Sequence, residues 1–404
     1  IKERMLNKDE QKPPLKLFYT STGGESWTGG LTYKKNLIYA LNSFCPEIKV
    51  FLCNERGNQD FIKYKNVKLV ETKFKNNLIT DYTNKILKHY FYYDFKTTKE
   101  LTKIEDGSPD VVFTTKFKIG KKIATLYWIP DFQFLRLPEM YSKVQIDSLN
   151  KSFRKGISNC DLVVLSSNDA KKDLEKFMPE ALPKSRVVSF VAHIPDNLYD
   201  KDPIFISKKY NLPEKFIYLP NQFWKHKNHI TVFQALKILK DKGIYPFLVL
   251  TGNPIDSRNP LYFAELMNEI SKWGLREQIA ILGFVEHDDV YHLIRQSLCV
   301  INPSFFEGWS TTVEEAKSVG KKMILSDIQV HREQNPPMAK YFNPLSPEEL
   351  AELLNEVWQT TPQGPDKELE EQAKKDILIR MKLFAETFAK VAIEAVTIKK
   401  GSNI

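Results

Sequence analysis

The chain has 404 residues, of which 42% are hydrophobic, so it is long enough for two or more domains with full cores. The mean hydropathy is −0.37 and no apolar run reaches the ~18 residues of a membrane span, which argues against a transmembrane helix. The net charge of +9 is compatible with anionic partners, but no RNP sequence, zinc finger or arginine-rich run indicates nucleic acid. Lysines that serve only as a solvated surface remain the alternative.

The four cysteines, Cys45, Cys53, Cys160 and Cys299, stand among apolar neighbours and form no C-x-x-C pair. This pattern predicts reduced core residues, and neither a disulfide framework nor a zinc site. The N-terminus shows no signal-peptide pattern. We therefore expect a cytoplasmic protein.

Short apolar runs of β-type residues alternate with helical or loop segments in both halves of the chain. The predicted strands are 15–20, 48–53, 67–71, 110–115, 123–129, 161–166 and 186–190, followed by 216–219, 247–251, 279–282, 298–302, 323–325 and 341–342. Such runs are typical of parallel strands covered on both faces. The sequence therefore predicts an α/β protein with two doubly wound, Rossmann-like domains.

Helices are predicted at 230–242, 262–273, 288–296 and 312–319, and one or two long helices follow residue 365. Prolines and acidic residues at 192–203 interrupt regular structure and indicate a boundary. The domains are expected at 1–200 and 201–375, with a last helical segment at 376–404. Ligands of open parallel sheets bind beyond the carboxyl ends of the strands, so a site is expected in the cleft between the two domains.

A glycine-rich loop, 21–30, follows the first predicted strand. Glycines allow close backbone approach to a ligand, and Gly29 and Gly30 are the candidates here. No G-x-G-x-x-G is present, so a dinucleotide site is not favoured. A flexible turn is the alternative interpretation.

A basic and aromatic stretch follows at 90–96, with lysines around it. Such a stretch fits a peripheral contact with a membrane surface or a lipid-linked acceptor. It fits equally a helix with its aromatic rings in the core and its lysines in water.

Two further strands end in polar loops. Asp131 follows the strand 123–129 within Pro130-Asp131-Phe132-Gln133, which makes it a candidate contact at a reaction centre or the cap of a turn. Lys225, His226 and Lys227 follow the strand 216–219 just before a helix. Cations at such a turn can stabilise a charge that develops on a leaving group. A basic helix start with exposed side chains is the alternative.

The most informative stretch is 302–316, in which a buried strand, a loop and a helix follow one another. Ser310 and Thr311 are good N-cap residues, and a helix start presents free N–H groups that suit a phosphate. Glu307 and Glu315 flank this helix start with seven residues between them, so both can border one pocket.

This stretch resembles the E-x7-E signature of retaining glycosyltransferases of the GT-B fold, most closely those of family GT4. The resemblance implies that Glu307 contacts the donor sugar, that Glu315 holds the ribose, and that backbone groups of the helix start hold the diphosphate. These backbone groups belong to Gly308, Trp309, Ser310, Thr311 and Thr312. A C-terminal helix that crosses back to the first domain is also typical of the family.

The same resemblance assigns the remaining candidates. Lys227 looks like the family lysine, Asn221 stands where the family has arginine, and Lys225 or His226 is left to supply a second charge. The stretch 283–289 looks like the loop that holds the nucleotide base, with Val285 as the contact and Asp288 alternatively as a helix N-cap. Gly29 and Gly30 match the loop over the donor phosphate, and Asp131 matches a polar residue near the acceptor hydroxyl.

The resemblance implies a retaining hexosyltransferase that works without a metal or other cofactor. Its donor would be a GDP-, UDP- or dTDP-linked sugar, and its acceptor a glycan or lipid-linked glycan of cell-surface polysaccharide synthesis. The missing arginine leaves an alternative open, namely a catalytically degenerate GT-B protein that binds sugar nucleotide or an anionic polymer. A sugar-nucleotide epimerase is a further alternative that the E-x7-E context disfavours.

Overall fold

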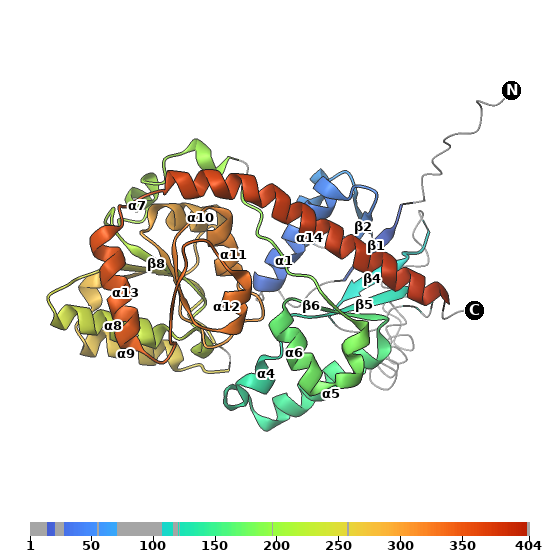
Figure 1. Cartoon of the computed structure of the whole chain (residues 1–404), viewed down its shortest axis with the longest axis horizontal. Helices are drawn as coiled ribbons and strands as arrows, with labels where there is room; N and C mark the ends of the chain where they lie inside the picture. The colour runs from blue at the N-terminus through green and yellow to red at the C-terminus, as the bar shows by residue number, and fades with distance from the viewer. Residues whose placement is uncertain are drawn as a thin grey trace.

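The computed structural model describes residues 14–20, 28–54, 56–70, 107–115, 120, 122–195, 197–256 and 258–401. Figure 1 shows two lobes, joined along one side by the long C-terminal helix. Each lobe is built on a parallel sheet, as the sequence predicts. The basic and aromatic stretch at 90–96 and most of the glycine-rich loop lie outside the described residues.

The N-terminal lobe contains a sheet of seven parallel strands among the described residues, in the order β3-β2-β1-β4-β5-β6-β7. The strands are β1 (Lys16–Tyr19), β2 (Lys49–Cys53), β3 (Val67–Val70), β4 (Val111–Thr114), β5 (Ala124–Ile129), β6 (Leu162–Leu165) and β7 (Ser185–Val187). The α-helices that the described residues of this lobe form are α1 (Thr28–Phe44), α4 (Gln133–Arg136), α5 (Lys143–Asn159) and α6 (Asn168–Phe177). Short 3-10 turns cover Arg56–Lys63, Pro138–Met140, Pro179–Lys184 and Leu198–Asp200.

The C-terminal lobe contains six parallel strands in the order β10-β9-β8-β11-β12-β13. The strands are β8 (Ile217–Pro220), β9 (Leu248–Thr251), β10 (Ile279–Ile281), β11 (Val300–Asn302), β12 (Met323–Ser326) and β13 (Lys340–Phe342). Its α-helices are α7 (Phe205–Lys209), α8 (His229–Asp241), α9 (Tyr262–Lys272), α10 (His287–Gln296), α11 (Thr311–Ser318), α12 (Gln329–Gln334), α13 (Pro347–Thr360) and α14 (Lys367–Gly401). Two 3-10 turns cover Lys225–Lys227 and Arg276–Gln278.

Successive side chains of the central strands point to opposite faces of the C-terminal sheet, and both faces are buried. Ile217 and Leu219 of β8 pack into the cluster formed with α8, α9 and α13, whereas Tyr218 between them packs into the cluster that contains α10 and α11. A strand with both faces covered must be apolar at every position, which is why the runs are continuous in the sequence.

Helix α14 connects the lobes, as Figure 1 shows in red. Near its start Glu370 pairs with Arg295 of α10, and near its end Lys399 pairs with Asp161 beside β6. Its apolar residues join one buried cluster with strands of both sheets. The boundary drawn at 375/376 falls inside this single continuous helix, because one helix serves both lobes.

The register of the sheets brings the polar loops together. Strand β11 lies beside β8, with Val300 opposite Tyr218, so the loops after these two strands leave the sheet side by side. In the other lobe β5 lies in the interior of the sheet and ends at Ile129, and Pro130 and Asp131 follow it. These edges form the walls of the cleft between the lobes.

Candidate functional site

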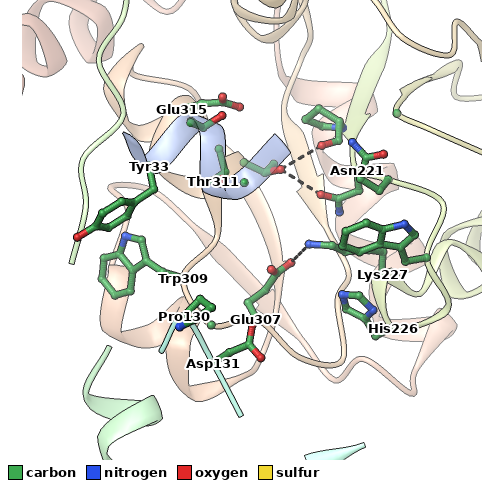
Figure 2. A pocket seen from close by; sticks show the side chains of 18 of the residues that line it. Tyr33, Pro130, Asp131, Asn221, His226, Lys227, Glu307, Trp309, Thr311 and Glu315 are labelled. Atoms are coloured by element: carbon green, nitrogen blue, oxygen red, sulfur yellow. Dashed lines mark hydrogen bonds and ion pairs between the residues drawn. The ribbon is translucent and has the colours of Figure 1, made fainter. Parts of the chain in front are cut away.

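A cavity of about 410 Å³ lies in the cleft, and residues of both lobes line it. This volume is within the ~300–1,000 Å³ that is typical of small-molecule sites. The predicted residues that line it are Gly29, Asp131, Asn221, Lys227, Val285, Glu307, Gly308, Trp309, Thr311, Thr312 and Glu315. Gly30, Lys225 and Ser310 are not among the lining residues. Figure 2 shows the middle of this cavity.

The start of α11 forms one wall of the cavity. Ser310 is the N-cap, and its hydroxyl accepts a hydrogen bond from the Val313 N–H at 3.3 Å. The N–H groups of the first helical turn have no acceptor within the helix. Those of Thr311 and Thr312 belong to residues that line the cavity. This wall therefore offers backbone donors and the positive end of a helix dipole to an anion.

Lys227 and Glu307 form a buried ion pair in the centre of the cavity, as Figure 2 shows. The Lys227 Nζ lies 2.6 Å from Glu307 Oε1, and the two side chains are only 13% and 8% exposed. Ser304 also donates to Oε1, at 2.7 Å. Burial alone would raise the pKa of Glu307, but the Lys227 charge and hydrogen bond outweigh it and lower this pKa to about 2. The carboxylate is therefore ionised at neutral pH.

Asn221, which stands at the position of the family arginine, is held by its neighbours. Its Nδ2 donates to Asn302 Oδ1 at 3.1 Å, and its Oδ1 accepts from the Thr312 hydroxyl at 3.0 Å. The amide thus ties the loop after β8 to the loop after β11 and to α11. It supplies no positive charge.

The two candidates for a second charge differ in position. His226 lines the cavity, but burial and the nearby Lys227 charge lower its pKa to about 3, so the imidazole is neutral. Lys225 is exposed and is not a lining residue. Within the described part of the chain, Lys227 is therefore the one lysine or arginine that lines the cavity.

Asp131 faces Glu307 across the cleft (Figure 2). Its Oδ1 accepts a hydrogen bond from the Gln133 N–H at 2.9 Å, which is the turn-capping geometry that the sequence left as an alternative. Burial raises the pKa of Asp131, the Gln133 N–H lowers it in part, and the Glu307 charge raises it further. Asp131 thus caps a turn and also borders the cavity.

The lobes meet closely at Gly308. A Cβ at this position would lie 2.4 Å from the Pro130 carbonyl oxygen and 2.7 Å from Asp131 Cβ, so only glycine fits. The neighbouring Trp309 donates its indole N–H to the Phe190 carbonyl at 2.9 Å. The loop after β11 therefore contacts the N-terminal lobe through both backbone and side chain.

Residues 283–290 form the end of the cavity that lies beside Glu315. Gly283, Phe284, Val285 and His287 line it together with Glu315. The Nε2 atom of His287 lies 3.1 Å from Glu315 Oε1. The interpretation of Asp288 as an N-cap is wrong, because α10 begins at His287 and its N-cap is Glu286.

Several lining residues were not assigned a role from the sequence. Gln133 and Trp224 stand inside stretches that the sequence analysis singled out, so their place beside predicted residues was the available signal. Thr251 is the last residue of β9 and Gly252 follows it, where the carboxyl-end rule would have pointed to them. Tyr33 and Phe190 carry no such signal, because the folding of α1 and of the segment after β7 brings them to the cavity.

Neither a metal-binding cluster nor a helix fit to span a membrane occurs within the described residues. No group of three or more His, Cys, Asp or Glu side chains in these ranges is placed to hold a metal ion. Within the same ranges, the longest and most apolar helices fall short of what a membrane span requires. That the protein works without a metal or other cofactor stays a prediction.

Two facing parallel sheets with a cavity at the carboxyl ends of their strands define the GT-B class of glycosyltransferase fold. Residues 200–376 match the family described as glycosyl transferases group 1. The chain is similar to this family over that segment, which contains the loop after β8, α11 and both glutamates. The resemblance drawn from the E-x7-E stretch is confirmed, since the fold is GT-B and this segment is similar to that family.

Other known proteins resemble this chain in sequence or in structure. An uncharacterised glycosyltransferase of Methanocaldococcus jannaschii is 23% identical over 274 residues, which cover 65% of this chain and 64% of that protein. O-antigen chain mannosyltransferase B of Escherichia coli is 21% identical over 223 residues, which cover 54% of this chain and 55% of that protein. The chain thus aligns with less than two-thirds of the length of each curated relative. The structure of Anabaena HepE in complex with UDP and glucose matches with a TM-score of 0.59 at 15% identity, covering 96% of this chain and 98% of that one.

Proposed function

We propose that this protein transfers a hexosyl unit from a nucleotide diphosphate sugar to a hydroxyl group of a glycan or glycoconjugate, with retention of configuration and without a metal ion. The observation that carries the proposal is the buried Lys227–Glu307 pair beside the open start of α11. A diphosphate requires cationic and N–H donors, whereas a sugar requires a carboxylate that accepts from its hydroxyls. Both kinds of group meet here in one cavity.

Each group has a place in the reaction. The N–H groups of Thr311 and Thr312, together with Lys227, would stabilise the diphosphate as the bond from sugar C1 to its oxygen breaks. Glu307 would accept hydrogen bonds from hydroxyls of the sugar, and Glu315 from those of the ribose. The acceptor oxygen would bond to C1 on the face that the diphosphate leaves, and its proton would pass to a diphosphate oxygen.

The relatives guide the choice of donor. The HepE structure contains UDP and glucose, and one curated relative is named a mannosyltransferase that acts on O-antigen chains. We therefore propose UDP-hexoses and mannosyl donors as the first substrates to test, and an acceptor from cell-surface polysaccharide synthesis. A cytoplasmic location with peripheral membrane contact belongs to the same proposal.

A binding protein without catalysis is the second candidate, and a specific observation favours it. Asn221 replaces the expected arginine and is neutral, and His226 is neutral as well. Only Lys227 remains in the described lining to balance a diphosphate. Turnover distinguishes the two candidates.

The test is release of nucleoside diphosphate from a panel of UDP-, GDP- and dTDP-sugars, with and without a glycan acceptor. We expect turnover with one donor, a loss of about 10²–10³ in kcat for Lys227→Ala, and a similar loss for Glu307→Gln. Lys237→Ala is the matched control, because Lys237 pairs with Asp241 on the surface of α8. Tight binding of a sugar nucleotide by the wild type without any turnover would establish the binding protein instead.

A further inference from the structure

Arg258 bridges the two lobes behind the cavity. It lies in the loop between β9 and α9, and its Nε contacts Asp256 of the same loop at 3.2 Å. Its Nη1 donates to two residues of the N-terminal lobe, to Gln133 Oε1 at 2.8 Å and to the Tyr141 hydroxyl at 3.1 Å. The guanidinium carbon lies 5.4 Å from the ring centres of both Tyr141 and Trp224, one from each lobe.

This bridge fixes the orientation of the Gln133 amide. Gln133 Oε1 accepts from Arg258 Nη1 at 2.8 Å and from the Tyr141 hydroxyl at 2.5 Å. A guanidinium has donors only, so the amide atom that faces Arg258 must be the oxygen. The nitrogen, with its two N–H donors, is therefore directed away from the bridge.

The amide nitrogen is left for a ligand. Gln133 is only 8% exposed and lines the cavity, and its Nε2 donates to no residue within the described ranges. The side chain has little access to water, so an acceptor oxygen supplied from the cavity would give this N–H donor a hydrogen-bond partner.

The position of Gln133 indicates what this acceptor is. Gln133 follows Asp131 by two residues and donates its backbone N–H to that carboxylate. In Figure 2 Asp131 lies on the opposite side of Glu307 from Glu315, the residue assigned to the ribose. Gln133 thus belongs to the end of the cavity that the sugars occupy in the proposed function, away from the nucleotide.

We propose that the Gln133 amide donates a hydrogen bond to a sugar hydroxyl, and that Arg258 is the positioning residue that holds the amide in this orientation. The inference rests on the proposed function. Because Arg258 and Gln133 belong to different lobes, the orientation is fixed only while the lobes are in contact. The hydroxyl belongs either to the transferred sugar or to the acceptor, and the experiment separates these two sources.

The first experiment compares wild type with Gln133→Glu, which keeps the length and the oxygen that faces Arg258 but removes both N–H donors. Calorimetry measures the affinity for the nucleoside diphosphate and for the sugar nucleotide. Gln145→Glu is the matched control, because Gln145 belongs to the capping box of α5, where glutamate is equally suitable. We expect unchanged binding of the nucleoside diphosphate by all three proteins.

A loss of about tenfold or more in sugar-nucleotide affinity for Gln133→Glu would identify the hydroxyl of the transferred sugar. Unchanged donor affinity with an acceptor KM raised about tenfold would identify the acceptor. If Gln133→Glu keeps both the sugar-nucleotide affinity and the acceptor KM of the wild type, the proposal is overturned while the proposed function stays intact. Absence of any sugar-nucleotide binding by the wild type would instead overturn the proposed function.

The role of Arg258 is tested with Arg258→Met and Arg258→Lys. Lysine can still donate to Gln133 Oε1, so we expect it to restore most of the sugar-specific affinity that Arg258→Met loses, at unchanged nucleotide affinity. Equal loss of sugar and nucleotide binding in Arg258→Met would contradict a positioning role. Gln133→Met, of similar size and without N–H donors, repeats the test if Gln133→Glu has a lowered melting temperature.

Discussion

At the scale of single residues, the cavity is defined by charges that compensate each other before any ligand binds. Lys227 forms an ion pair with Glu307, and the Glu315 carboxylate accepts a hydrogen bond from the His287 ring. In the proposed function, a bound diphosphate would therefore share a lysine that is already paired. Such pre-paired groups keep a buried site stable when it is empty, because an unpaired buried charge is costly.

Lys227→Met should lower the free energy of unfolding by about 3 kcal/mol, since it leaves the Glu307 carboxylate buried without a partner. The depressed pKa of Glu307, about 2, means that the pair stabilises the fold fully above about pH 4.5 and loses this effect as the pH falls toward 2. Urea unfolding at pH 7 and at pH 3 measures the difference. Glu307→Gln added to Lys227→Met should recover most of the loss, and a double variant no more stable than the single one would contradict the assignment.

His287→Asn should remove a pH-dependent contribution to the stability of the fold. Burial would lower the pKa of His287, but the hydrogen bond and charge of Glu315 outweigh it and raise this pKa above the usual value. A raised pKa stabilises the fold below the unfolded-state value of about 6.5, and the effect disappears as the pH rises through the folded-state value. Melting temperatures from pH 5.5 to 8.5 should therefore differ between wild type and variant at the acidic end and converge at the alkaline end. A constant difference would show that His287 acts through packing alone.

At the scale of secondary structure, a buried contact holds the start of α14. The guanidinium of Arg295 in α10 contacts both carboxylate oxygens of Glu370, at 2.6 and 3.2 Å, and also donates to the carbonyls of Leu198 and Lys201 in the segment between the lobes. One arginine thus joins the C-terminal lobe, the connecting segment and the long helix. Helix α13 was not predicted, although Ser346 and Pro347 form a recognisable helix start.

Glu370→Gln should lower the free energy of unfolding by about 3 kcal/mol, because Arg295 then remains buried without a counter-charge. The adjacent Glu371→Gln is the control, since Glu371 pairs with Lys374 in water and its loss should change the stability little. Urea titration measures both variants. Equal effects would mean that the buried pair is not what holds α14.

At the scale of the whole molecule, the cavity has walls on both lobes, so a ligand that fills it stabilises their contact. A nucleoside diphosphate at 100 times its Kd should add about 2.7 kcal/mol to the stability of the folded state. A thermal-shift screen with UDP, GDP, dTDP and ADP should therefore give an increase with one base, and this increase should be lost in Glu315→Ala. An equal shift in Glu315→Ala would place the nucleotide elsewhere.

The sequence by itself determined the two-domain α/β fold and pointed to the lysine and the three carboxylates that line the cavity. Buried parallel strands require continuous apolar runs, and the spacing of Glu307 and Glu315 across a helix start is a local property. The tertiary structure alone decided what depends on distant segments. Burial lowers the pKa of His226 and makes the imidazole neutral. Arg295 of α10 contacts the segment between the lobes as well as α14. The contact of the two lobes places Arg258 against Gln133, which precedes it by 125 positions. Such pairings leave no periodic trace in a sequence, because they arise only after each domain has folded and the two surfaces have met.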